Sequence, residues 1–139
     1  MVSTPSPASR PGARPAPWRR RAILALAGIV LVPSLLLVLY TMAALRFAYS
    51  SGERAGYVQK FSRKGWICKT WEGELAMVNL PGAMPEVFAF TVRDDAIASR
   101  LNATMGQRVA LSYEQHRGIP TQCFGETEYF VTAVKPLGP

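Results

Sequence analysis

The sequence has one histidine and two cysteines, and this scarcity excludes several kinds of chemistry. His116, Cys68 and Cys123 supply at most three soft ligands, short of a closed zinc site, and the cysteines do not have the CxxC spacing. Catalysis by a nucleophile with a base, or by paired acids, also has few candidate residues here. We therefore expect no enzyme activity, no bound metal and no cofactor.

Nucleotide-binding motifs are missing as well. The sequence contains neither GxGxxG nor a P-loop, and it has no repeated strand and helix units that could support them. Beyond the two N-terminal segments described below, only about 90 residues remain to fold, which allows one small domain. A domain of this size suits a binding module better than an enzyme with a large internal cavity.

The positive charge is concentrated at the N-terminus. The net charge is +7, and the first 21 residues hold five arginines and no acid. From Arg46 onward, 11 Lys and Arg stand against 9 Asp and Glu, a net of +2. This distribution indicates contact with anionic lipid or membrane topology, so we expect no nucleic-acid partner. Residues 1–21 are also rich in proline and are predicted to be disordered.

Residues 22–45 contain no charged side chain and are predicted to form a transmembrane helix. A helix of this length measures about 36 Å and can cross a hydrocarbon core of about 30 Å. Pro33 predicts a kink rather than a break, because the Ser34 hydroxyl can satisfy the carbonyl that the proline frees. A cleaved signal peptide is the alternative, but the run is longer than a usual signal core and no small-residue cleavage site follows it.

Basic residues flank this helix in similar numbers on both sides, so charge alone does not orient it. The N-terminal segment is the shorter piece to leave in the cytoplasm, and a pair of cysteines suits an oxidising compartment. We therefore expect a single-pass membrane protein with a cytoplasmic N-terminus and a C-terminal domain in the periplasm or outside the cell.

After a linker at residues 46–54, residues 55–136 are predicted to form a mainly β domain with one short helix. Gly73 is expected to be a bulge or a coiling point. Glycine, proline and alternating apolar residues place strands at 56–62, 66–78, 87–92, 109–115 and 123–134.

A helix is expected between the third and fourth strands. Asp94 or Asp95 can cap it, and Ile97, Leu101 and Met105 recur every four residues. Three strands, one helix and two further strands is the order of the OB-fold, a five-stranded barrel. The predicted fold is therefore an N-terminal transmembrane helix followed by a small OB-like β-barrel.

The OB-fold would bring the two cysteines together. In that topology the loop between strands one and two and the loop between strands four and five flank the same binding face. Cys68 follows the first of these loops and Cys123 the second. We expect a disulfide here, which would add about 4 kcal/mol to the free energy of unfolding by the loop-entropy estimate. Two unrelated buried thiols are the alternative.

Basic and aromatic side chains are interleaved on the first predicted hairpin, and four of them are candidate binding residues: Lys64, Trp66, Lys69 and Trp71. On a free OB domain this pattern would indicate stacking with single-stranded nucleic acid. The nearby membrane helix favours lipid headgroups instead. A structural role, with the tryptophans in the core and the lysines in water, is the third interpretation.

His116 is the remaining candidate binding residue. A histidine at a strand end is usually an exposed polar residue, whereas as a ligand it would mark a haem or metal site. Four glutamates alternate on two predicted strands, which is typical of the solvated side of a sheet: Glu72, Glu74, Glu126 and Glu128.

Three segments carry a resemblance to a known family: residues 51–75 (SGERAGYVQKFSRKGWICKTWEGEL), 113–116 (YEQH) and 123–131 (CFGETEYFV). They are similar to a family of small uncharacterised bacterial membrane proteins, some of which have been labelled 6-phosphogluconate dehydrogenase. The chain lacks the dinucleotide motif and the length that such an enzyme needs. The resemblance therefore implies a bacterial single-pass membrane protein and brings no activity with it.

A second resemblance is to the membrane-anchored periplasmic haem chaperone of cytochrome c maturation, which also combines an anchor with an OB barrel. Its haem motif has a tyrosine a few residues after the histidine, whereas His116 is followed by RGIP and by no tyrosine before Tyr129. We therefore predict a membrane-anchored, non-enzymatic envelope module that binds membrane lipid or a protein partner. The alternative is a haem or metal chaperone centred on His116, with the cysteines as redox partners.

Overall fold

The computed structural model describes residues 17–77 and 81–138. The chain divides into two compact units, Met1–Val38 and Leu39–Pro139. The predicted disorder of residues 1–16 lies outside the described residues, as does the predicted strand end at Val78.

Helix α1, Pro17–Arg46, is the one helix of the described residues that is long and apolar enough to cross a membrane. It begins before the predicted start at residue 22, so residues 17–21 are helical and the prediction of disorder is wrong for them. Proline is tolerated in the first turn of a helix, and arginine is a good helix former. The helix therefore extends past the apolar run into the arginine cluster.

Within α1, the helix continues through Pro33 as predicted. The Ser34 hydroxyl donates to the carbonyl oxygen of Val30 at 2.7 Å. The carbonyl that a proline deprives of its donor lies four residues before it, which here is that of Ile29. The serine bond therefore reaches the carbonyl next to the expected one.

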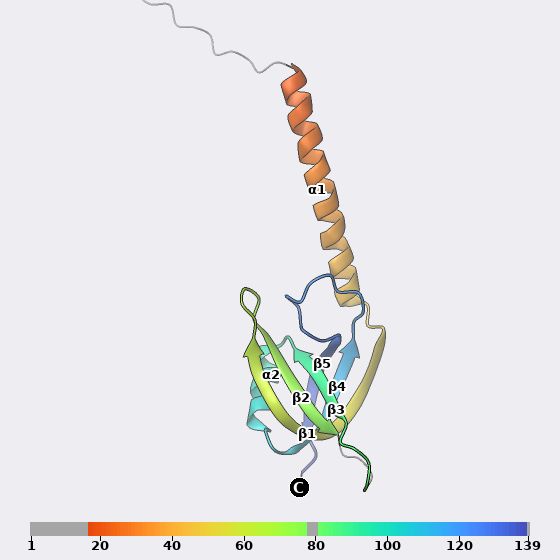
Figure 1. The fold of residues 1–139 in the computed structure, drawn as a ribbon, viewed down its shortest axis with the longest axis vertical. Coiled ribbons are helices and arrows are strands. Elements are labelled where there is room, and N and C mark those ends of the chain that lie inside the picture. Colours follow the sequence, from red (N-terminus) through yellow and green to blue (C-terminus); the bar gives the residue numbers. More distant parts are fainter. Residues whose placement is uncertain (1–16, 78–80, 139) are drawn as a thin grey trace, which may run out of the picture. The chain divides into compact units, whose positions relative to one another are not determined.

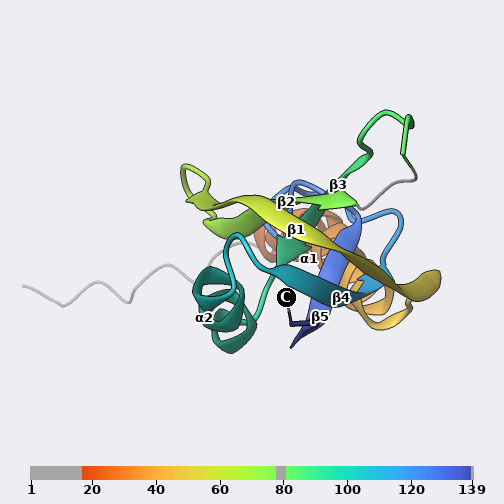
Figure 2. The ribbon, with the colours of Figure 1, turned by 90° about the horizontal axis from the view of Figure 1, so that it is seen from below.

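The five strands form one closed barrel in the order β1-β2-β3-β5-β4, which confirms the predicted OB-like fold (Figure 1). β3 and β5 pair in parallel, through Thr91 and Phe130, and the other pairs are antiparallel. Figure 2 shows the strands closing around the core, with helix α2 beside the ring. The strands are β1 Ser50–Lys64, β2 Thr70–Met77, β3 Val87–Val92, β4 Arg108–Gln115 and β5 Tyr129–Pro136.

Strand β1 is longer than predicted because it pairs with two neighbours. Its first half pairs with β4 and its second half with β2, and Gly56 takes part in both registers. A Cβ atom at Gly56 would lie 2.2 Å from the carbonyl oxygen of Ala76, so only glycine fits there. Most of the predicted linker at residues 46–54 is thus strand; its side chains are largely exposed, which leaves no apolar pattern to read.

Two strands begin later than predicted. β2 starts at Thr70 rather than residue 66, because Gly65 has a φ of +126° and opens the hairpin loop. β5 starts at Tyr129, because residues 123–128 belong to the β4–β5 loop. Gly73 is not a bulge: a Cβ atom there would lie 2.4 Å from Cζ of Phe90, so the glycine makes room for that ring.

Helix α2, Asp95–Ala103, closes the core between β3 and β4. The Asp94 side chain accepts a hydrogen bond from the Ala96 amide at 2.7 Å, which confirms the predicted cap. Ala98 and Leu101 are buried against the strands. The rest of the core comes from inward-facing strand residues: Val58, Leu75, Phe88, Phe90, Val92, Val109, Leu111 and Val131.

Candidate functional site

A disulfide between Cys68 and Cys123 joins the β1–β2 hairpin to the β4–β5 loop, with the two Cα atoms 4.9 Å apart. The predicted pairing is therefore present, and the alternative of two unrelated thiols is wrong. In an OB-fold these two loops flank the binding face. We call the surface formed by residues 63–69 and 116–128 the disulfide-linked face.

The hairpin ends in two fully exposed apolar side chains. Trp66 is 100% exposed and Ile67 is 97% exposed. Gly65 shapes this tip, because its left-handed backbone is open to glycine alone and an added Cβ atom would collide with the carbonyl of Cys68. Behind the tip, Nζ of Lys64 lies 3.5 Å from Oε2 of Glu126, so an ion pair also links the two loops.

Basic and aromatic groups surround a shallow pocket of about 300 Å³ beside the hairpin. The guanidinium of Arg63 lies 5.7 Å from the ring centre of Trp71, and that of Arg93 lies 5.7 Å from the ring centre of Phe124. Lys69 lines the same pocket. Among the ion pairs of the described residues, none involves these three cations. Asp95 also lines the pocket, so the three cations leave the lining with a net positive charge that can attract an anionic ligand.

Trp71 differs from Trp66 in its surroundings. Its ring stacks on Phe61 with centroids 5.2 Å apart, and its Nε1 donates to Oδ1 of Asp95 at 2.9 Å. One ring face and the indole N–H are thus used inside the protein. Of the two predicted binding tryptophans, Trp66 is free to meet a partner, whereas Trp71 is mainly part of the pocket wall.

Glu72 is buried, at 5% exposure, so the expectation that it lies on a solvated strand face is wrong. Its Oε1 accepts from the Thr70 hydroxyl at 2.7 Å and from the Glu126 amide at 3.1 Å. Its Oε2 accepts from the Thr91 hydroxyl at 2.7 Å. This carboxylate ties β2 to β3 and to the β4–β5 loop, and so supports the disulfide-linked face from within. Glu74 fits the prediction better, with its side chain 41% exposed.

His116 is also buried, at 5% exposure, rather than an exposed residue at a strand end. Its Nδ1 lies 3.1 Å from the carbonyl oxygen of Ala44, and its Nε2 lies 3.2 Å from Oε2 of Glu114. Both ring nitrogens are therefore engaged by acceptors, whereas a haem or metal ligand needs a free ring nitrogen. Among the described residues, no three His, Cys, Asp or Glu side chains form a group that could hold a metal ion.

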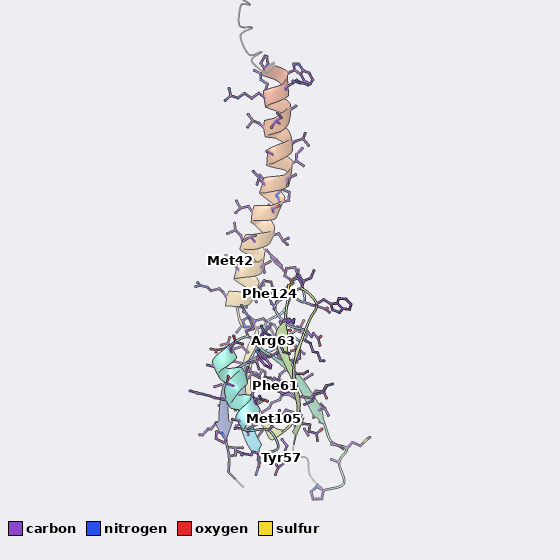
Figure 3. The ribbon with its side chains drawn as sticks, turned by 90° about the vertical axis from the view of Figure 1, so that its left-hand side faces the viewer. Met42, Tyr57, Phe61, Arg63, Met105 and Phe124 are labelled. Carbon is purple, nitrogen blue, oxygen red and sulfur yellow. A yellow bond between two sulfur atoms is a disulfide. The ribbon has the colours of Figure 1, made fainter. Side chains whose placement is uncertain are left out.

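The β4–β5 loop also contacts the last turns of α1, inside the unit Leu39–Pro139. The Tyr40 hydroxyl donates to the carbonyl oxygen of Gly118 at 3.0 Å, and Ala44 meets His116 as described above. Within this unit, Figure 3 shows Phe124 and Arg63 at the end of the barrel nearest to Met42. Tyr57 lies at the opposite end of the barrel. The disulfide-linked face is thus at the same end of the barrel as residues 40–44.

Sequence reasoning missed four residues of this site. Ile67 could have been found as the second apolar residue of a turn marked by glycine. Arg93 and Phe124 come from β3's end and the β4–β5 loop, and only the barrel brings them together. Tyr40 gave no signal because a tyrosine near the end of an apolar run is common in any membrane helix.

The fold is similar to that of the mitochondrial single-stranded DNA-binding protein from S. cerevisiae, with a TM-score of 0.51 and 10% sequence identity over 66% of this chain and 97% of that one. This likeness shows the OB fold. The prediction of no nucleic-acid partner is wrong as an exclusion, because a barrel of the same fold belongs to a DNA-binding protein.

No curated protein matches this sequence. Residues 48–139, which include every described strand and α2, match the family described as a domain of unknown function (DUF8785). This chain therefore belongs to the DUF8785 family.

Proposed function

We propose that this protein is a membrane-anchored, non-enzymatic binding module of the cell envelope, and that its disulfide-linked face binds a protein or lipid partner. One observation carries the proposal: the Cys68–Cys123 disulfide fixes the two loops that flank the binding face of an OB-fold. Trp66 is exposed at the tip of the first loop, and Arg63 and Lys69, which make none of the ion pairs among the described residues, belong to the same hairpin. Exposed apolar groups among polar neighbours are typical of interaction sites.

The placement in the envelope rests on α1 and on the disulfide. We assign α1 as a membrane span because it is long, apolar and free of buried residues. A disulfide suits an oxidising compartment, which favours a periplasmic barrel and a cytoplasmic N-terminus. The resemblance to small bacterial membrane proteins supports the same assignment to a bacterial inner membrane.

Single-stranded nucleic acid is the second candidate partner. The observation that favours it is the pocket in which Arg63, Lys69 and Arg93 stand beside Trp71 and Phe124. Cations next to aromatic rings are what single-strand binders use to hold phosphates and to stack bases. This pocket adjoins the hairpin tip, so one experiment can address both candidates.

The experiment is photo-crosslinking in intact membranes from a photoreactive side chain placed at Ile67. We expect protein or lipid adducts, and we expect Trp66→Ala to reduce them about tenfold or more, as for a central aromatic residue of an interface. Adducts that disappear on nuclease treatment would instead favour the second candidate.

The matched control places the same photoreactive side chain at Tyr57, which is 45% exposed at the other end of the barrel. It should not form the adducts seen at Ile67. If Trp66→Ala leaves every adduct at Ile67 unchanged, the disulfide-linked face is not the binding surface and the proposed function fails.

A further inference from the structure

The tip of the β1–β2 hairpin is an apolar surface that no other described residue covers. Trp66 and Ile67 are adjacent and almost completely exposed. Exposing two large apolar side chains to water is unfavourable, so we expect a binding partner to cover them in the functional state of the protein. Tryptophan is also the side chain most enriched at the boundary between lipid and water, because its ring is apolar and its N–H is polar.

The tip is held in shape before any partner arrives. Gly65 makes the turn that lifts Trp66 and Ile67 from the barrel. Cys68 then fixes the end of the tip to the β4–β5 loop. Little conformational entropy remains to be lost when such a tip inserts into a neighbouring phase, which favours insertion.

The tip also lies at the end of the barrel that contacts α1. The β4–β5 loop, to which Cys68 is bonded, hydrogen-bonds Tyr40 through Gly118 and Ala44 through His116. The apolar run of α1 ends at Leu45, so residues 40–45 would lie at the membrane surface in an anchored chain. Anchoring therefore holds the hairpin tip near the headgroups of the same membrane.

The charges around the tip select the kind of surface. Arg63, Lys64 and Lys69 flank Trp66 and Ile67 on the hairpin. Two acids lie near these cations: Glu126, which pairs with Lys64, and Asp95, which lines the pocket with Arg63 and Lys69. The basic groups therefore outnumber the acids around the tip. Basic groups beside an exposed tryptophan match a bilayer that contains anionic lipid. A protein partner would have to supply both an apolar socket and acidic groups at the membrane surface, whereas lipid supplies both.

We propose that Trp66 and Ile67 insert into the headgroup region of the membrane that anchors the chain, with Arg63 and Lys69 on anionic lipid headgroups. The proposal rests on the proposed membrane anchoring and names lipid as the partner of the hairpin tip. Insertion gives the barrel a second attachment point and fixes which side of it faces away from the bilayer.

The test uses the full chain in vesicles of phosphatidylcholine with phosphatidylglycerol whose acyl chains are brominated close to the headgroup. Trp18→Phe and Trp71→Phe leave Trp66 as the fluorophore, and the phenylalanine at 71 keeps the stacking on Phe61. We expect Trp66 emission to shift to the blue and to be quenched by the bromines. In this background Lys69→Gln should lower the ratio of inserted to free tip about fivefold, and vesicles of phosphatidylcholine alone should lower it further.

Two matched controls sharpen the result. A lone tryptophan placed by Tyr57→Trp, with all three natural tryptophans replaced by phenylalanine, should remain unquenched at the far end of the barrel. Lys135→Gln removes the same charge as Lys69→Gln from an exposed position near the end of strand β5 and should leave quenching unchanged. Unquenched Trp66 with the emission of a water-exposed indole, in vesicles that retain the protein, overturns the proposal. Protein that does not stay with the vesicles overturns both the insertion and the membrane anchoring. Absence of insertion together with unchanged crosslinks at Ile67 overturns the insertion alone and leaves the proposed function standing.

Discussion

The full chain with Cys68→Ser and Cys123→Ser should have a free energy of unfolding about 4 kcal/mol below that of the natural protein. The disulfide closes a loop of 55 residues, and without it the unfolded chain regains the freedom that this closure removes. For a domain of this size the loss corresponds to a melting temperature lower by roughly 20 °C. Urea and thermal unfolding in detergent micelles, followed by tryptophan fluorescence, measure both quantities.

The control is the reductant itself. Reduction of the natural protein should lower its stability to that of the double serine variant, and the variant should not respond to reductant. Equal stability of the oxidised natural protein and the variant would contradict a disulfide that contributes to folding. Either serine substitution alone should behave like the pair, since one cysteine cannot close the loop.

Glu72→Ala should lower the free energy of unfolding by about 3 kcal/mol, because a buried carboxylate that accepts charge-assisted hydrogen bonds leaves its donors unsatisfied when it is removed. The donors that lose their partner are the hydroxyls of Thr70 and Thr91 and the amide of Glu126. Thr91 is 0% exposed, so water cannot replace the lost acceptor without a change in packing. Urea unfolding of the full chain is the measurement.

Glu74→Ala is the matched control for this carboxylate. Glu74 lies two residues further along β2, and its Oε1 pairs with Nζ of Lys60 at 3.2 Å on the surface. Exposed pairs of this kind contribute less than about 1 kcal/mol, so this variant should stay close to the natural protein. Equal losses for the two glutamates would mean that Glu72 is not the buried acceptor that joins β2, β3 and the β4–β5 loop.

The sequence predicts the elements that have a local signal. Strand β3, Val87–Val92, has the predicted bounds because its apolar run is bounded by a proline on one side and the acidic helix cap on the other. Helix α2 begins after Asp94 as predicted, since a capping side chain and a four-residue apolar period lie close together in the chain. The cysteine pair follows from topology, because the OB order places both flanking loops on one face.

Features that depend on distant partners could not be predicted in this way. The first half of β1 is held by backbone pairing with β4, which does not require an apolar pattern. Glu72 shares its alternation with surface glutamates, and only the approach of Thr91 and the β4–β5 loop identifies it as buried. His116 likewise is buried among distant partners, since it contacts Ala44, 72 residues earlier in the chain, and the ring of Phe130.

The site shows the same division between local and distant signals. The interleaved pattern predicts the hairpin residues Lys64, Trp66 and Lys69, and the structure places them on one face with Cys68 and Cys123. Phe124 and Arg93 carry no pattern of their own and reach this face through the fold. The hairpin part of the proposed binding face can therefore be predicted, because its residues are neighbours in the sequence. The part that Phe124 and Arg93 contribute cannot be predicted, because only the fold brings it to the hairpin.

The central claim is that α1 anchors the chain in the inner membrane and that the disulfide-linked barrel lies outside this membrane. Thiol labelling with a membrane-impermeant maleimide tests this claim most directly, in cells whose outer membrane has been permeabilised. We predict that the natural protein stays in the membrane pellet at alkaline pH, takes no label before reduction, and takes label at Cys68 and Cys123 after it. As a control, Trp18→Cys in the double serine variant should take label only after the inner membrane is opened. Three results would contradict this arrangement. They are protein in the alkaline supernatant, label before reduction, and label at the two natural cysteines only after the inner membrane is opened.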